Sequence, residues 1–274
     1  MDVGKRGSQE WLASRTEAPA SFSPWGFPGA VWQLTWGKPV WTWQTLVVLL
    51  LLGLALCGVA AHRWLRGPWP ADDFIAEVLV PAYLGFLMPM VCLSSGVQVL
   101  GGAWEEGWLL WLLLRPMPRS AVYLIFLLAA VPWTLLMSLG GALALASAAG
   151  TDALRATVSV LVPIALGGLA YLTLFVFFSV VFRRAALVSI AYVFVVENFI
   201  GYMPGLISRA SISFYLRSLL AEAGWLVPNS TDTLFPFQAT SGSVARGVLL
   251  GTSVLWTGLG AMLFARREYA DPNL

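Results

Sequence analysis

Long apolar segments separated by short polar ones dominate the sequence from residue 44 onward. Six of these segments are close to the roughly 20 residues that an α-helix needs to cross a bilayer. Arg183 and Arg184 alone separate the fourth from the fifth, but one helix of about 47 residues would exceed any bilayer. The pattern therefore predicts an all-α membrane protein with six transmembrane helices. Their expected ranges are 44–61, 78–101, 121–143 (or as far as Ala149), 157–182, 185–203 and 246–265.

The segments at the two ends of the chain differ from these spans. Residues 1–24 are charged or small, which predicts a flexible cytoplasmic tail, and 269–274 are expected to form a C-terminal tail. Between tail and first span, 25–43 holds five tryptophans interleaved with glycine, proline and Lys38. Indole rings favour the lipid headgroup layer, so this segment is predicted to be an interfacial elbow. The alternative is a tryptophan-rich loop.

The stretch 104–119, between the second and third predicted spans, has a composition of its own. Glu105 and Glu106 stand at its start, where a helix N-terminus favours negative charge. Leucine and tryptophan fill about three turns of helix after them, and Pro116 and Pro118 stop it. The segment is too short and too closely framed by charge to cross a bilayer. It is expected to lie at one membrane face.

The distribution of lysine and arginine predicts the orientation. If both termini are cytoplasmic, ten basic residues lie inside and six outside. The inner set is Lys5, Arg6, Arg15, Lys38, Arg115, Arg119, Arg183, Arg184, Arg266 and Arg267. The outer set is Arg63, Arg66, Arg155, Arg209, Arg217 and Arg246. The pairs 183–184 and 266–267 directly flank membrane ends, which favours cytoplasmic termini. Arg63 and Arg66, directly after the first predicted span, favour the opposite orientation.

Composition supports a membrane protein and limits the chemistry. Of 274 residues, 58% are hydrophobic and only 11% charged, against about a quarter charged in a soluble domain. The net charge of +2 does not indicate nucleic acid as a partner. Cys57 and Cys92 both fall in apolar runs and are expected to be small buried hydrophobic residues, in neither a disulfide nor a metal site.

The sequence offers little chemistry that could drive a reaction. A Walker phosphate loop requires Gly-Lys-Ser/Thr after a glycine-rich turn. The only lysines, Lys5 and Lys38, precede Arg and Pro, so ATP binding by that route is not expected. His62 is the sole histidine and lies at a membrane edge, where it is expected to be a surface residue. No catalytic residue, metal ligand or cofactor is therefore predicted in this chain.

Glu197 is the one clear acid within a predicted span. It lies about 20 Å along the helix from Arg184. Acids inside a membrane are costly and by default raise a functional question. One hypothesis places Glu197 at a central cavity, as a gate or a contact for substrate. The alternative is a structural role, through a pair with Arg209 or a hydrogen bond to Asn198 or to another helix.

Other patterns concern packing and the longest connection, 204–245. Apolar residues recur through 207–220 with arginines between them, which predicts a short helix on the outer membrane surface. Close approach of helices is suggested by two GxxxG spacings, Gly201 to Gly205 and Gly247 to Gly251. Kinks are suggested by prolines within spans. These are Pro81, Pro89, Pro132 and Pro163.

The stretch 104–119 resembles the cytoplasmic coupling segment of ABC transporter permeases of the ABC-2 exporter type. The matching residues are Glu105, Gly107, Leu109, Leu112, Leu113, Arg115, Pro116 and Arg119. Glu197 with 204–206 and 212–216 is similar to that family's fifth span and outer re-entrant region. Residues 264–268, Phe-Ala-Arg-Arg-Glu, are similar to its closing motif.

The resemblance implies a six-span permease in a bacterial cytoplasmic membrane, paired with a second permease copy or a related permease. Two separate ATPase subunits would bind ATP and Mg²⁺ and move the coupling segment, in which Glu106 is also expected to take part. A gate or substrate pathway would include Glu197, Asn198, Pro204 and Tyr215. The alternatives are an ion-gradient transporter or channel, and a membrane anchor for a cytoplasmic complex. The apolar face of 104–119 could also lie in lipid instead of binding a partner.

Overall fold

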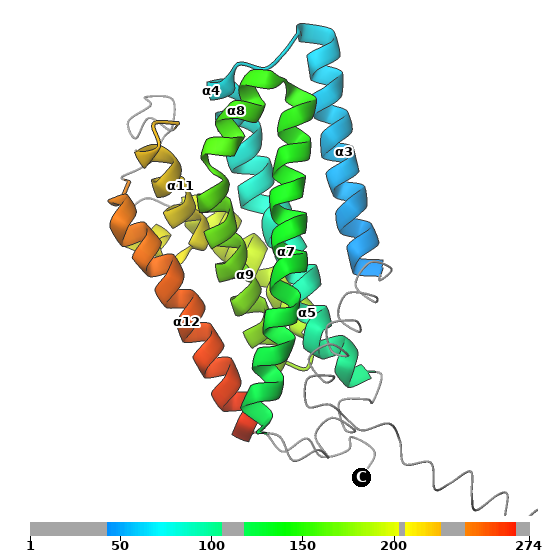
Figure 1. Cartoon of the computed structure of the whole chain (residues 1–274), viewed down its shortest axis with the longest axis vertical. Helices are drawn as coiled ribbons and strands as arrows, with labels where there is room; N and C mark the ends of the chain where they lie inside the picture. Colours follow the sequence, from blue (N-terminus) through cyan, green and yellow to red (C-terminus); the bar gives the residue numbers. More distant parts are fainter. Residues whose placement is uncertain (1–42, 106–117, 203–205, 226–238, 267–274) are drawn as a thin grey trace, which may run out of the picture.

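The computed structural model describes residues 43–105, 118–202, 206–225 and 239–266, and this part of the chain is helical without a strand (Figure 1). A helix satisfies its own backbone hydrogen bonds, as an apolar surrounding requires. The label η marks π- and 3₁₀-helices. In chain order the elements are α3 (Trp43–Arg66), α4 (Ala71–Phe74), η2 (Ile75–Leu87), α5 (Met88–Glu105), α7 (Arg119–Ala149), α8 (Thr151–Ser159), α9 (Leu161–Val181), α10 (Ala185–Tyr192), η3 (Val193–Phe199), η4 (Ile200–Tyr202), η5 (Leu206–Ala210), α11 (Ile212–Glu222) and α12 (Gly242–Arg266).

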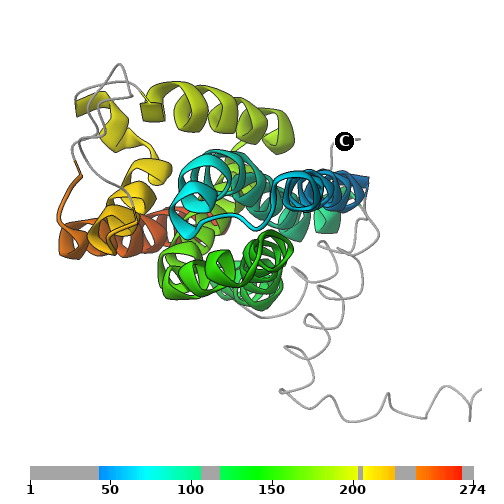
Figure 2. The ribbon, with the colours of Figure 1, turned by 90° about the horizontal axis from the view of Figure 1, so that it is seen from above.

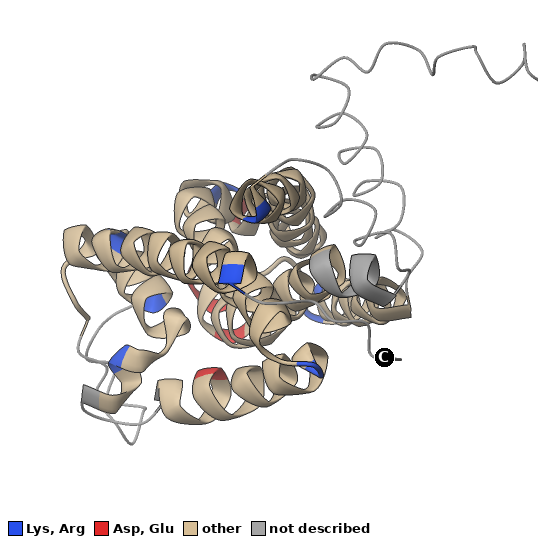
Figure 3. Cartoon of the chain, turned by 90° about the horizontal axis from the view of Figure 1, so that it is seen from below, with Lys and Arg blue, Asp and Glu red and all other residues tan. Residues whose placement is uncertain are grey.

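The bundle has two ends that differ in charge. At the lower end in Figure 1, Tyr123 of α7, Val180 of α9 and Phe264 of α12 share one apolar cluster. We call it the arginine end, after Arg119, Arg183, Arg184 and Arg266. Figure 3, a view from this side, shows few charged segments among mostly uncharged helices. The opposite, mixed-charge end is defined by Arg63, Arg66, Asp72, Asp73, Asp152, Arg155, Glu222 and Arg246.

Five helices are long and apolar enough to span a membrane, which agrees with the predicted membrane protein. They are Trp43–Arg66, Ala71–Val99, Arg119–Ala149, Leu161–Val181 and Gly242–Arg266. The fifth predicted span, 185–203, is shorter: α10 and η3 together cover Ala185–Phe199. At 1.5 Å per residue this helix is about 22 Å long, less than the roughly 30 Å of a bilayer core.

The fourth predicted span, 157–182, begins differently in the structure. Residues 151–159 form the separate helix α8, and the chain breaks at Val160, whose φ and ψ are −109° and 14°. Pro163 then lies in the first turn of α9, where its missing N–H costs no intrahelical hydrogen bond. Pro163 therefore begins a helix where a kink was suggested.

The second span contains the clearest distortion. Residues 75–87 form a π-helix, η2, with Pro81 inside it, and α5 continues from Met88 with Pro89 as its second residue. A proline removes one backbone donor and crowds the preceding turn, and a wider helical turn relieves the crowding. Both prolines of this span thus lie within or just after the widened segment.

α9 lies at the centre of the bundle and packs against α5, α7, α10, α11 and α12. Its contact with α5 is close because Gly96 of α5 has no side chain: a Cβ there would lie 2.9 Å from Cβ of Phe175. α3 and α12 lie at opposite edges of the bundle (Figure 2). Cys92 is buried as predicted, but the prediction is wrong for Cys57, which is exposed because α3 packs through only one narrow face.

At the mixed-charge end, the connection after α3 is fixed to the end of α7. Nη1 of Arg63 donates to the carbonyl oxygens of Ser147 and Ala148 at 3.3 Å each. The ring of His62 stacks on that of Trp69, with centroids 3.8 Å apart. The carbonyl groups of Ser147 and Ala148 belong to the last turn of α7, where the helix dipole favours a positive charge. Arg63 therefore has a structural reason to lie at this end.

Candidate functional site

The predicted coupling residues fall where the described chain is interrupted. Glu106, Gly107, Leu109, Leu112, Leu113, Arg115 and Pro116 lie outside the described residues. Glu105 is the last residue of α5 and Arg119 the first of α7. α5 ends and α7 begins toward the arginine end of the bundle (Figure 1). No side-chain geometry is described for the segment.

Glu197 in η3 is completely buried, and four donors point at its carboxylate. The hydroxyl of Tyr192 donates to Oε1 at 2.9 Å, and the hydroxyl of Ser211 donates to Oε2 at 2.7 Å. The backbone N–H groups of Ile212 and Ser213 donate to Oε1 at 3.1 Å and to Oε2 at 3.0 Å. Each oxygen thus accepts two hydrogen bonds, which suits a carboxylate because it only accepts them.

The two backbone donors are the first residues of α11, so Glu197 caps this helix. N-terminal N–H groups have no intrahelical partner, and the helix dipole adds a partial positive charge there. Ser211 occupies the N-cap position but makes no cap hydrogen bond with its own helix. Its hydroxyl donates to Glu197 instead, and the carboxylate takes the usual role of the cap. A buried negative charge is thereby compensated by a helix N-terminus.

Tyr171 of α9 places a further hydroxyl group next to this carboxylate. It is completely buried and close enough to Glu197 for the two groups to interact electrostatically. Its hydroxyl has no hydrogen-bond partner of normal geometry within the described part of the chain. A carboxylate offers about four acceptor positions, and the other donors already occupy four. The site is therefore saturated with donors.

Arg217 of α11 makes the complementary contact. Its Nη2 donates to the carbonyl oxygen of Gly201 in η4, and its Nε donates to the carbonyl oxygen of Ser213 at 3.4 Å. Gly201 follows η3 at the end of the first helical piece, where the dipole leaves a partial negative charge. The acid of the first piece thus caps the start of the second, and a base of the second caps the end of the first. We call these contacts the reciprocal caps.

Asn198, the neighbour of Glu197, joins η3 to the second span. Its Nδ2 donates to the carbonyl oxygen of Gly85 in η2 at 3.4 Å and to that of Val193 at 3.0 Å. Gly85 lies in the last turn of the π-helix η2. The π-helical parts of two spans are linked at this point.

The other predicted gate residues lie elsewhere. Pro204 is outside the described residues. Tyr215 is half-buried on α11, with its ring against that of Phe214 at 5.3 Å. Arg209 is exposed and makes no ion pair with Glu197 in the part of the chain that the structure describes. Of the structural alternatives for Glu197, the hydrogen bond to another helix is the one observed.

The helix expected within 207–220 is present but does not lie on a surface. Seven of the eleven residues of α11 are buried, and Leu216 packs against Gly167 of α9 and Met88 of α5. The apolar pattern fits both placements, so it could not distinguish them. The apolar pattern also does not identify the partners of Glu197 in the site, which include Tyr192, Ser211, Ser213 and Arg217. Only Ser211 carried a signal, since serine is a common N-cap residue.

Replacing Gly201 by alanine is expected to loosen the site. The added Cβ would lie 2.8 Å from Oγ of Ser211 and 3.1 Å from Oγ of Ser213, so the first hydroxyl must move from Glu197. Such overpacking typically lowers the free energy of unfolding by about 1–3 kcal/mol. Thermal unfolding of the purified protein in detergent measures the change. Gly58→Ala in α3 is the control, because nothing lies within 4 Å of its added Cβ; equal midpoints would contradict the expectation.

Comparison with protein families, curated proteins and solved structures gives no match for this chain.

Proposed function

We propose that this chain is the membrane-spanning permease subunit of an ATP-driven ABC exporter of the ABC-2 type. The observation that carries the proposal is the composition and place of 104–119. Its acids, glycine and Leu-Trp turn join two spans at the arginine end, and they resemble the coupling segment of that family. An apolar helix face of this kind fits a groove on a soluble partner. Closure of two ATPase subunits would move it and, through it, α5 and α7.

The charges of the two ends support a cytoplasmic arginine end. Arginine near membrane ends favours the cytoplasmic side. Arg63 is the main argument against this orientation, because it lies on the outer side when both termini are cytoplasmic. In the structure Arg63 donates to two carbonyl oxygens at the end of α7, so its position is explained by helix capping. Without Arg63, the count of lysine and arginine residues on the two sides favours cytoplasmic termini more strongly. The protein would then be a multi-pass protein of the bacterial inner membrane.

The reciprocal caps favour an ATP-driven permease over an ion-coupled transporter. Transporters with broken helices leave the half-helix ends open to ions or to charged groups of the substrate. Here the start of α11 is occupied by Glu197, and the carbonyl of Gly201 by Arg217. The chain also lacks a Walker sequence. Energy would therefore come from a separate nucleotide-binding subunit that holds ATP and Mg²⁺, and two permease copies would complete the transporter.

Purification of the chain from its native membrane is expected to bring a Walker-containing ATPase with it. Changing Glu105→Gln together with Arg115→Gln should abolish this association, because these charged residues frame the proposed docking helix. The matched control is Glu222→Gln with Arg246→Gln, the same two changes at the mixed-charge end. Immunoblotting and ATPase activity of the eluate provide the measurement.

Two results would contradict the proposal. The first is transport by the reconstituted chain alone, driven by an ion gradient, which would favour a secondary transporter or a channel. The second is cysteine labelling in intact cells that places 104–119 on the outer side of the membrane. A membrane anchor would bind its complex through the same segment without transport, so vesicle transport assays separate it from a permease.

A further inference from the structure

We infer that the turn between α9 and α10 binds the headgroup of an anionic phospholipid, whose acyl chain lies along the outer face of α10 and η3. This binding requires neither an ATPase partner nor a particular orientation of the chain in the membrane. Helix α9 ends at Val181 and α10 begins at Ala185, so Phe182, Arg183 and Arg184 form the whole connection. Both arginines are exposed, and we call them the arginine pair.

The arginine pair has no partner in the part of the chain that the structure describes. Neither side chain forms an ion pair or a hydrogen bond there. The one acid among the described residues of the arginine end is Glu105, the last residue of α5. The dipoles of α9 and α10 offset each other at this turn, because one helix ends where the other begins. The turn therefore carries the positive charge of its two guanidinium groups.

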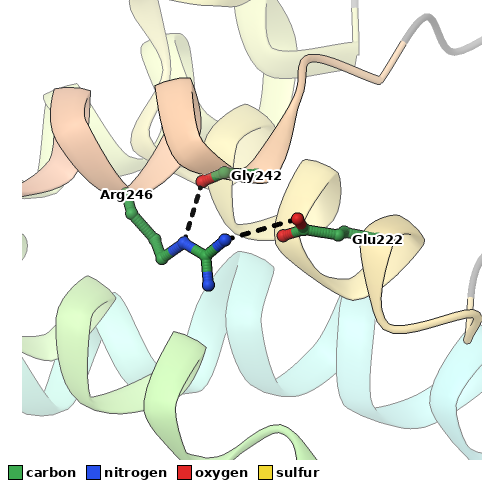
Figure 4. A network of polar contacts seen from close by, with 3 residues as sticks. All are labelled: Glu222, Gly242 and Arg246. Atoms are coloured by element: carbon green, nitrogen blue, oxygen red, sulfur yellow. Dashed lines mark hydrogen bonds and ion pairs between the residues drawn. The ribbon is translucent and has the colours of Figure 1, made fainter.

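Two arginines of the mixed-charge end show the alternative, which is a partner within the protein. Nη2 of Arg246 is 3.3 Å from Oε1 of Glu222, and its Nε donates to the carbonyl oxygen of Gly242 at 3.1 Å (Figure 4). Arg63 donates to two carbonyl oxygens of α7. Four acids also balance the four arginines that define this end. Among the described residues, excess positive charge is thus concentrated at the arginine end, where it favours an anionic partner.

Exposed apolar side chains continue from the arginine pair along one face of α10 and η3. Leu187, Ile190 and Phe194 follow one another at helical spacing and are all exposed. Ala185 and Ser189, on the other side of the same helix, are buried. Half of the roughly 30 Å bilayer core corresponds to about ten residues of helix, which is the distance from Ala185 to Phe194. An acyl chain in one leaflet would therefore cover this apolar face.

The combination of charge and apolar surface favours a lipid over two other occupants. A free phosphate would bind the arginine pair but gain nothing from Leu187 and Ile190. A second copy of this chain, related by a two-fold axis normal to the membrane, would bring an identical arginine pair to the same depth, where like charges repel. An anionic phospholipid fits both parts, because guanidinium groups bind phosphate through paired hydrogen bonds and the acyl chain contacts the apolar face.

The test is binding of phosphatidylglycerol to the purified full chain in a neutral detergent, measured as the lipid-bound fraction by native mass spectrometry. Phosphatidylcholine with the same acyl chains is the reference, because its headgroup has no net charge. One arginine near an anionic headgroup raises the affinity about fivefold, so Arg183→Gln with Arg184→Gln should weaken phosphatidylglycerol binding about thirtyfold. Phosphatidylcholine binding should not change. The matched control is Arg66→Gln with Arg155→Gln, which removes two exposed arginines from the mixed-charge end and should leave both affinities unchanged.

Equal affinity of the unmodified chain for the two lipids, or an equal loss in the control variant, would overturn the inference. Equal thermal midpoints of the two double variants without added lipid would exclude misfolding as the cause of the loss.

A separate variant, Leu187→Ser with Ile190→Ser, tests the acyl chain and should weaken the binding of both lipids. Unchanged phosphatidylglycerol binding in this variant would indicate a site for a free anion and would contradict the lipid. The second copy is tested with Ile190→Cys in a chain that also carries Cys57→Ala and Cys92→Ala. A disulfide between two such chains in native membranes would show that a second copy covers this face, which would also overturn the inference.

Discussion

Replacing Glu197 by alanine is expected to lower the free energy of unfolding by at least about 3 kcal/mol. The change removes the acceptor of four hydrogen bonds in a completely buried place. Two of the abandoned donors are backbone N–H groups at the start of α11, and no other carboxylate lies among the described contacts of these groups. Glu197→Gln is expected to cost nearly as much, because its amide NH₂ would face donors and its charge no longer meets the helix dipole.

The measurement is the midpoint of thermal unfolding in detergent. Unfolding is monitored as the fraction of protein that stays monodisperse in gel filtration. Glu77→Gln is the matched control: it is the same substitution in another π-helix, but at an exposed residue. We expect its midpoint to stay within the range of ordinary surface substitutions. Tyr192→Phe removes one donor of the site and should give an intermediate loss. A midpoint for Glu197→Gln equal to that of Glu77→Gln would show that the buried cap does not stabilise the fold.

The long apolar helices were predictable because bilayer thickness sets their length and composition independently of their neighbours. Their ends were less predictable. α3 continues to Arg66, five residues past the predicted end, because Arg63 finds acceptors on α7. The apolar run 157–182 is divided, because α8 ends at Ser159 and α9 begins at Leu161. In both cases contacts or backbone geometry outside the pattern decide the boundary.

The candidate site was predictable only in part. A lone acid in a span identified Glu197, since such a residue must find partners. Its partners could not be found by periodicity. They are the hydroxyl of Tyr192, five residues earlier, and groups at the start of α11, 14 to 16 residues later. The break between η3 and α11 was predicted, since the fifth span was expected to end at 203 and a separate helix to lie within 207–220, but the pairing across the break was not. The same holds for Asn198, whose acceptor, the carbonyl oxygen of Gly85, lies in a different span.

These contacts connect the second, fifth and last predicted spans in one series. Asn198 joins η3 to η2, Glu197 and Arg217 join η3 and η4 to α11, and Glu222 joins α11 to α12. The Glu222–Arg246 ion pair is about half exposed and therefore weak, whereas the Glu197 contacts are buried. A movement of the second span would thus reach α11 through η3.

The two glycine positions Gly96 and Gly251 are expected to respond with opposite sign to the same substitution. Alanine is favoured over glycine in a helix interior by about 1 kcal/mol, so helix propensity alone predicts that both changes stabilise. Nothing lies within 4 Å of a Cβ at Gly251, and Gly251→Ala should therefore stabilise slightly. A Cβ at Gly96 would lie 2.9 Å from Cβ of Phe175 and 3.2 Å from the backbone nitrogen of Val176, neither of which can swing aside.

Gly96→Ala must therefore separate α5 from α9, the central helix of the bundle, and should lower the free energy of unfolding by about 1–3 kcal/mol. Paired thermal unfolding of the two variants in detergent measures the difference. Sequence spacing favours the opposite result, because Gly251 belongs to a GxxxG pair and Gly96 does not. Stabilisation of both variants would mean that α5 and α9 are not in close contact. Since α5 leads into the proposed coupling segment, that contact also connects the segment to the central helix α9.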